Sequence, residues 1–163
     1  MKGYISPTVG QLTLTEMVAE LVAFLAEDPQ AAYQLVIGTD SQERYSGKEK
    51  LANYVTAVVV HRQGKGGRYF WRNGKKEKVL SLRQKIYTET SLSLEAAGEL
   101  VPRLRQRLNG LARWSLEIHV DIGQSGQTRE MIAEVVGMVK GNGYEACTKP
   151  EAYAASSVAD KHA

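Results

Sequence analysis

The chain has 163 residues, of which 43% are hydrophobic and 24% are charged, and its formal net charge at pH 7 is +3. This length and balance favour one domain with a buried core and exclude an intrinsically disordered chain. The small positive charge permits an anionic partner such as nucleic acid without requiring one. The single cysteine, Cys147, excludes an internal disulfide bond and favours a reducing compartment.

No targeting or membrane-spanning pattern is visible. The opening segment, MKGYISPTVGQ, lacks the apolar core of a signal peptide. No apolar stretch approaches the ~20 residues that a membrane-spanning helix needs. We therefore expect a cytoplasmic protein with one domain over residues 1–163, in which residues 1–30 form a helical N-terminal extension.

The first half of the chain predicts a helix followed by three strands. Thr13 and Glu16 form the T-x-x-E pattern of a capping box, and apolar residues at helical spacing follow as far as Leu25. Short segments rich in branched and aromatic residues then predict strands. These strands are expected at residues 32–40, 54–62 and 68–71, with polar loops at residues 43–53 and 72–78.

The second half predicts alternating helices and strands. A long helical pattern ends at Asn109 and Gly110, which together form a typical stop signal. The expected elements are a helix at 81–108, a strand at 115–121, a helix at 128–140, a short strand at 144–148 and a last helix from 150. The order after the N-terminal helix is β-β-β-α-β-α-β-α, which predicts an α/β fold with a mixed five-stranded sheet flanked by helices.

Two predicted strands end on an aspartate, at Asp40 and Asp121. The long helix can act as a crossover that returns the fourth strand parallel to the first, which would place both carboxylates at one edge of the sheet. Neighbouring carboxylates repel one another unless a cation lies between them, and hard cations such as Mg²⁺ or Mn²⁺ prefer oxygen ligands. The alternative is that each aspartate only ends a strand or caps a turn.

Two further acids extend this hypothesis. At about 100° per residue, Glu89 and Ser93 lie on the apolar face of the long helix, whereas Glu95 points almost the opposite way. A buried glutamate is costly unless it is paired or binds a metal, and Lys85 is an alternative partner one turn earlier. Asp160 shares a polar face of the last predicted helix. The apolar face of the long helix comprises Leu82, Ile86, Ala96, Ala97, Leu100, Leu104 and Leu111.

Cationic residues surround the predicted hairpin and the starts of two helices. They can pair with phosphates, although charged hairpin tips also protect sheet edges from aggregation. Among the interleaved aromatic residues, the period of two in a strand predicts that Phe70 lies in the core. The candidate substrate-binding residues are Arg62, Lys65, Arg68, Arg83 and Lys149.

Four segments resemble the YkuK-like family of bacterial ribonuclease H-like proteins, which has no established activity. They are IGTDSQ, VVVHRQGKGGRYFW, SLRQKIYTETSLSLE and the stretch from HVDIGQSGQ to the C-terminus, so that the resemblance begins near residue 35. It implies a ribonuclease H-like fold with Asp40, Glu89, Asp121 and Asp160 as catalytic residues and metal ligands.

The resemblance further implies two Mg²⁺ or Mn²⁺ ions and hydrolysis of phosphodiester bonds in RNA, DNA or an RNA/DNA hybrid. Two other functions are compatible with the same residues: a non-catalytic nucleic-acid-binding module, and a protein-interaction module in which the acids are structural. No histidine or cysteine cluster indicates a zinc site in the sequence.

Overall fold

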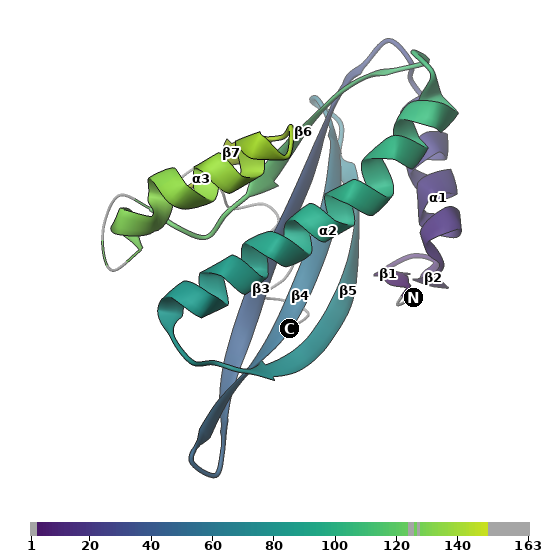
Figure 1. Cartoon of the computed structure of the whole chain (residues 1–163). Helices are drawn as coiled ribbons and strands as arrows, with labels where there is room; N and C mark the ends of the chain where they lie inside the picture. The colour runs from purple at the N-terminus through teal and green to yellow at the C-terminus, as the bar shows by residue number, and fades with distance from the viewer. Residues whose placement is uncertain (1–2, 124–125, 127, 150–163) are drawn as a thin grey trace.

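The computed structural model describes residues 3–123, 126 and 128–149 (Figure 1). Three helices and one short 3₁₀ segment accompany seven strands in this part of the chain. In chain order the elements are β1 (Tyr4–Ser6), β2 (Gly10–Leu12), α1 (Leu14–Ala26), β3 (Ala32–Ser46), β4 (Glu49–Arg62), β5 (Gly67–Lys78), α2 (Leu82–Leu108), β6 (Arg113–His119), η1 (Arg129–Met131), α3 (Ile132–Gly141) and β7 (Glu145–Cys147). The last predicted helix, with Asp160, lies outside the described residues.

The strands form one mixed sheet in the order β2-β1-β5-β4-β3-β6-β7. β3, β4 and β5 are antiparallel neighbours, while β6 lies parallel to β3 and β7 lies parallel to β6. The predicted mixed sheet and the parallel return of the fourth predicted strand are confirmed. Two strands were not predicted, because β1 and β2 have three residues each, too few to show a periodicity of two.

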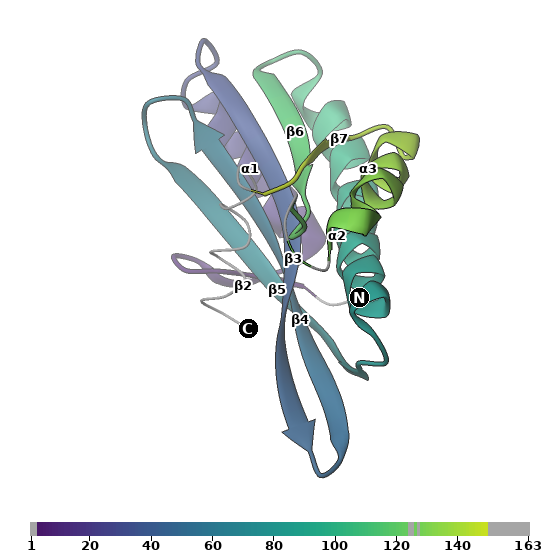
Figure 2. The same ribbon diagram turned by 90° about the vertical axis from the view of Figure 1, so that its left-hand side faces the viewer.

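The predicted loops at residues 43–53 and 72–78 are wrong, because these residues continue the three central strands apart from a two-residue turn at Gly47 and Lys48. β3 and β4 remain paired as far as Ser46 and Glu49, and the hairpin projects beyond the helices in Figures 1 and 2. Ion pairs link its strands to one another and to β5, at 2.7 Å between Lys50 Nζ and Glu43 Oε2 and 3.2 Å between Lys78 Nζ and Glu49 Oε1. A strand with little apolar surface to bury can be polar throughout, which makes it resemble a loop in sequence.

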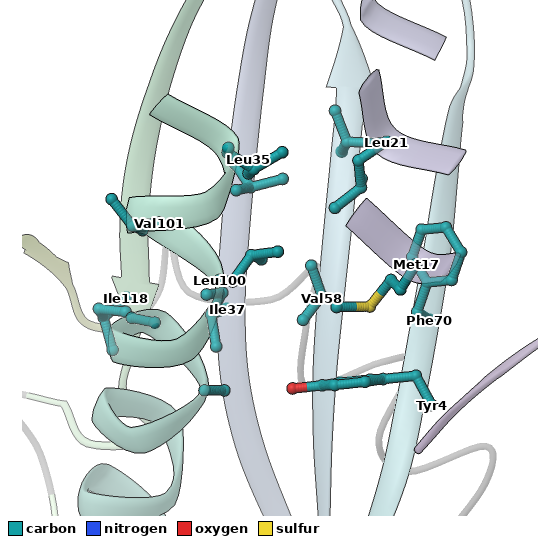
Figure 3. Packing of buried hydrophobic residues seen from close by; sticks show 14 of the residues in the cluster. Tyr4, Met17, Leu21, Leu35, Ile37, Val58, Phe70, Leu100, Val101 and Ile118 are labelled. Atoms are coloured by element: carbon teal, nitrogen blue, oxygen red, sulfur yellow. The ribbon is translucent and has the colours of Figure 1, made fainter. Parts of the chain in front are cut away.

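One face of the sheet is covered by α1, α2 and α3, whose apolar residues form the main core with those of the strands. Figure 3 shows Met17 and Leu21 of α1 and Leu100 of α2 beside Leu35, Ile37 and Val58 of the sheet. The side chain of Phe70 is 3% exposed in this core, as predicted. The N-terminal helix thus packs on the sheet, and its predicted capping box between Thr13 and Glu16 is present.

The long helix α2 crosses the sheet in front of β3, β4 and β5 (Figure 1). Its predicted buried face is confirmed, since Glu89 and Ser93 are buried and Glu95 is exposed. Leu111 is an exception: the helix ends at Leu108, Asn109 adopts a left-handed conformation with φ 42°, and Leu111 is 49% exposed. A buried Thr39 hydroxyl joins the helix to the sheet through hydrogen bonds of 2.8 Å to Ser93 and 3.0 Å to Thr56.

The opposite face of the sheet has a smaller buried cluster of its own, formed by Val36, Ala57 and Val59. Side chains alternate between the two faces along each strand, and paired residues point to the same side. Val36 pairs with Glu117 in β6, and Gly38 pairs with His119, so Glu117 and His119 belong to this second face. No described helix is long and apolar enough to cross a membrane.

Candidate active site

Asp40 lies inside β3, and Asp121 follows the end of the neighbouring strand β6 by two residues. The parallel register of β3 and β6 runs as far as the pair Gly38 and His119, and the same offset places Asp40 opposite Asp121, two residues after β6 ends. Asp40 is 9% exposed and lies inside β3, so the prediction that the strand stops there is wrong.

Backbone hydrogen bonds fix the segment that contains Asp121. The N–H of Val120 donates to the carbonyl of Cys147 at 2.9 Å, and the N–H of Lys149 donates to the carbonyl of Ile122 at 2.8 Å. The ladder between β6 and β7 therefore continues past both strands. It places Asp121 and Lys149 on adjacent segments.

Glu89 joins this pair from α2. Its side chain is buried, with the residue 5% exposed, and its Oε2 accepts a hydrogen bond of 2.8 Å from the hydroxyl of Ser41. The N–H of Ser41 donates to Oδ1 of Asp40 at 2.8 Å. Ser41 therefore links two of the predicted acids, a role that the sequence did not indicate because a serine after a strand is common in turns.

Burial raises the pKa of Glu89 to about 8. The hydrogen bond from Ser41 and the charge of Lys85 oppose this rise, while the negative charges of Asp40 and Asp121 add to it. Both aspartates thus act electrostatically on Glu89, although the carboxylate oxygens of the three residues do not all lie within 4.8 Å of one another. We refer to these three carboxyl groups as the carboxylate cluster. Burial, assisted by these negative charges, therefore favours the protonated form of Glu89 in the absence of a bound cation.

Lys149 provides a cation within this cluster. Its Nζ lies 2.7 Å from Oδ1 of Asp121. That hydrogen bond and the charge of Asp121 raise the pKa of Lys149, and the charges of Asp40 and Glu89 contribute in the same direction. Lys85, the alternative partner proposed for Glu89, forms an ion pair of 3.1 Å with Glu43 instead.

The remaining candidate substrate-binding residues fall into two groups. Arg83 lies in the first turn of α2, six residues before Glu89, and its Nη1 is 2.8 Å from Oε2 of Glu134. Arg62 pairs with Tyr33, seven residues before Asp40 in β3, which corresponds to roughly 23 Å along the strand. Lys65 and Arg68 lie at that same distant end. The structure therefore brings Lys149 to the carboxylates, places Arg83 on the helix that carries Glu89, and separates the other three residues from them.

Arg62 also has partners of its own at that end of the sheet. It donates hydrogen bonds to the hydroxyl of Tyr33 at 3.1 Å and to the carbonyl of Phe24 at 2.9 Å. Its guanidinium lies 4.3 Å from the centre of the Phe24 ring, and it forms an ion pair with Glu27. These contacts attach α1 to the sheet.

The chemistry of the carboxylate cluster fits a hard divalent cation. Its donors are carboxylate oxygens, which Mg²⁺ and Mn²⁺ prefer. The pKa of Glu89 is raised mainly by burial and further by the negative charges of Asp40 and Asp121, and a divalent cation held by these carboxylates would offset both effects. Asp40, Glu89 and Asp121 are the described residues that would hold it.

A second group of potential ligands was missed in the sequence. One ligand atom each of Glu117, His119 and Cys147 lies within 4.8 Å of the others. Cys147 is far from the other two along the chain, and the parallel pairing of β6 with β7 unites them. The alternation that places Glu117 and His119 on one face was a detectable signal, but the position of Cys147 depended on the topology.

Comparisons with known proteins agree with this architecture. The model of the family described as Ribonuclease H-like matches residues 16–163. The chain is also 35% identical over 160 residues to a Bacillus subtilis (strain 168) protein described as Uncharacterized protein YkuK. That alignment covers 93% of this chain and 91% of the relative. The chain therefore belongs to the YkuK-like family of ribonuclease H-like proteins.

Proposed function

We propose that this protein is a metal-dependent nuclease that hydrolyses phosphodiester bonds in RNA, DNA or an RNA/DNA hybrid. The family supports a role connected with nucleic acids. The observation that supports catalysis most strongly is the buried carboxyl of Glu89, which two aspartates from neighbouring strands influence electrostatically. Burying a carboxyl group costs folding free energy, and a perturbed carboxyl beside other acids is typical of functional sites, so this arrangement favours a functional role.

Asp40, Glu89 and Asp121 would hold Mg²⁺ or Mn²⁺ in this proposal, with Asp160 as a fourth candidate ligand outside the described residues. Bound divalent ions would supply a lowered pKa for the attacking water and charge stabilisation for the leaving oxygen. Ser41 positions two of the carboxylates, because its hydroxyl donates to Glu89 and its N–H donates to Asp40.

Lys149 and Arg83 are the proposed phosphate contacts. Lys149 pairs with Asp121 in the metal-free protein, and a divalent cation bound by Asp121 would compete with that contact. Its ammonium would then be available for a phosphate oxygen beside the carboxylates. The Arg83 side chain is 57% exposed, so nucleic acid could reach its guanidinium.

The ion pair between Lys149 and Asp121 also favours a second candidate function, a non-catalytic nucleic-acid-binding module. An ammonium 2.7 Å from a carboxylate oxygen neutralises part of the cluster without any metal. In that case the protein would retain nucleic acid at low salt and cleave none of it.

The decisive variant is Asp40→Asn. We expect it to abolish Mn²⁺-dependent cleavage of end-labelled RNA, DNA and hybrid substrates, because an amide is a weaker ligand for a hard cation than a carboxylate. The matched control is Glu95→Gln, which changes an exposed carboxyl on the opposite side of α2 and should leave cleavage unchanged.

The unmutated protein distinguishes the two functions. If the unmutated protein cleaves none of these substrates with Mg²⁺ or with Mn²⁺, the nuclease proposal is refuted. Retention of nucleic acid without cleavage would support the binding module, and failure to retain nucleic acid at low salt would exclude that module as well.

A further inference from the structure

The second face of the sheet contains three potential metal ligands of different chemistry. Glu117 and His119 are two residues apart in β6 and point to the same side, and Cys147 of β7 pairs directly with His119 in parallel register. On the other side of His119, the paired residue is Gly38, which contributes no side chain. A carboxylate, an imidazole and a thiol therefore meet at one place on this face.

The spacing of these groups suits one metal ion. Nε2 of His119 lies 3.2 Å from Oε2 of Glu117, and one ligand atom from each of the three residues lies within 4.8 Å of the others. Two ligands bonded at about 2.0–2.1 Å in tetrahedral geometry are themselves about 3.3 Å apart. Small side-chain rotations would therefore complete a three-ligand site without movement of the strands.

Contacts around the cluster orient the carboxylate and leave part of the imidazole unsatisfied. Nε2 of Gln34 donates to Oε1 of Glu117 at 2.9 Å, which directs Oε2 toward His119. His119 is only 8% exposed, and its Nδ1 is buried with no hydrogen-bond partner in the described part of the chain.

We propose that Glu117, His119 and Cys147 bind one borderline-soft transition-metal ion of the Zn²⁺ class. Thiolate and imidazole ligands favour Zn²⁺ over Mg²⁺, whereas the carboxylate cluster of Asp40, Glu89 and Asp121 favours hard ions. Binding converts the Cys147 thiol to a thiolate and releases its proton to solvent. Three protein ligands leave a fourth position for water or another ligand. This site adjoins the proposed nuclease site, because His119 and Cys147 are two residues from Asp121 and Lys149, but it uses other ligands and does not depend on nuclease activity.

The single cysteine makes the site accessible to a direct spectroscopic test. Co²⁺ commonly substitutes for Zn²⁺, and thiolate coordination gives a sulfur-to-cobalt charge-transfer band in the near ultraviolet. Because Cys147 is the only cysteine in the chain, any such band in the monomeric full-length protein reports on this residue. We expect the band to saturate at one Co²⁺ per chain, to disappear when Zn²⁺ is added, and to persist in excess Mg²⁺.

Variants assign the other two ligands. We expect Cys147→Ser to abolish the band, and His119→Ala to weaken Co²⁺ binding by more than about tenfold, since loss of an outer-shell partner alone costs about 10–100-fold. Glu117→Gln should also weaken it. Asp40→Asn, which alters the carboxylate cluster instead, should bind Co²⁺ normally.

The rate of Cys147 alkylation in the unmutated protein tests the site without any variant that could fail to fold. Zn²⁺ should slow alkylation of Cys147 by iodoacetamide, and Mg²⁺ should not. Absence of a thiolate band at excess Co²⁺ would overturn the proposal, as would alkylation that Zn²⁺ leaves unchanged. Normal Co²⁺ binding by a folded His119→Ala variant would overturn the ligand assignment.

Discussion

The residue that distinguishes this site is Glu89, a carboxyl group buried in the interface between α2 and the sheet. Its environment combines burial, one hydrogen bond from Ser41 and the repulsion of two aspartates. The helical phase of the sequence was sufficient to predict that Glu89 is buried, because the apolar residues around it repeat at helical spacing. Ser41 could not be predicted as its partner, because that contact depends on how α2 docks on β3.

The raised pKa of Glu89 predicts how Glu89→Gln changes stability with pH. Folding shifts this pKa from 4.5 to about 8, so the folded protein favours the protonated form. The contribution of Glu89 to stability is therefore fully present below pH 4.5 and is lost as the pH rises through 8. Glutamine cannot ionise, so we expect the metal-free variant to be more stable than the unmutated protein at pH 8.5, by on the order of a few kcal/mol.

Urea unfolding at several pH values in the presence of a chelator measures this difference. The difference in the free energy of unfolding in favour of Glu89→Gln should be small near pH 4.5 and should grow toward pH 8. Glu95→Gln, on the exposed side of the same helix, should show no such trend. A Glu89→Gln variant less stable than the unmutated protein at pH 8.5 would contradict the assigned environment.

The ion pair between Lys149 and Asp121 predicts that removing the lysine strengthens Mn²⁺ binding. Its ammonium competes with divalent cations for Asp121, because its Nζ is 2.7 Å from Oδ1 of that residue. We expect Lys149→Gln to raise the affinity for Mn²⁺ several-fold, as measured by isothermal titration calorimetry. Lys140→Gln, at an exposed position of α3, is the control and should leave the affinity unchanged. Unchanged or weaker Mn²⁺ binding by Lys149→Gln would show that the lysine does not compete with the metal.

At the scale of elements, the sequence predicted long amphipathic helices better than strand boundaries. α2 has ten buried positions at helical spacing, so its extent and its inner face were both detectable. The outer halves of β3, β4 and β5 resemble loops because they are polar and are held largely by backbone pairing and cross-strand ion pairs. These segments are strands because their neighbours in the sheet pair with them, and the local sequence carries no signal of that pairing.

Leu100 in α2 and Leu111, three residues beyond its end, test the difference between helical phase and actual burial. Leu100 is 0% exposed and Leu111 is 49% exposed, although both fall on the predicted apolar face. We expect Leu100→Ala to reduce the free energy of unfolding by about 2–5 kcal/mol, because it opens a cavity between α2 and the sheet. Leu111→Ala should change it by less than about 0.5 kcal/mol. Equal effects in chemical denaturation would refute the placement of the helix end at Leu108.

At the scale of the whole molecule, the parallel return of β6 beside β3 was predictable, because a long helical crossover between two strands favours it. That one topological step places Asp40 opposite Asp121. The pairing of β7 with β6 was harder to predict from the sequence, because β7 has only three residues. Cys147 was therefore not connected with Glu117 and His119. The sheet thus presents a carboxylate cluster and a mixed-ligand cluster as neighbouring but chemically different sites.

The central claim is that Asp40, Glu89 and Asp121 hold a divalent cation. The most direct measurement is a crystal structure of the full chain with Mn²⁺, in which anomalous scattering locates the ion. We predict an anomalous peak coordinated by these three carboxylates, with Lys149 displaced from Asp121. At saturating Mn²⁺, the absence of a peak between these carboxylates, with Lys149 still paired to Asp121, would contradict the claim.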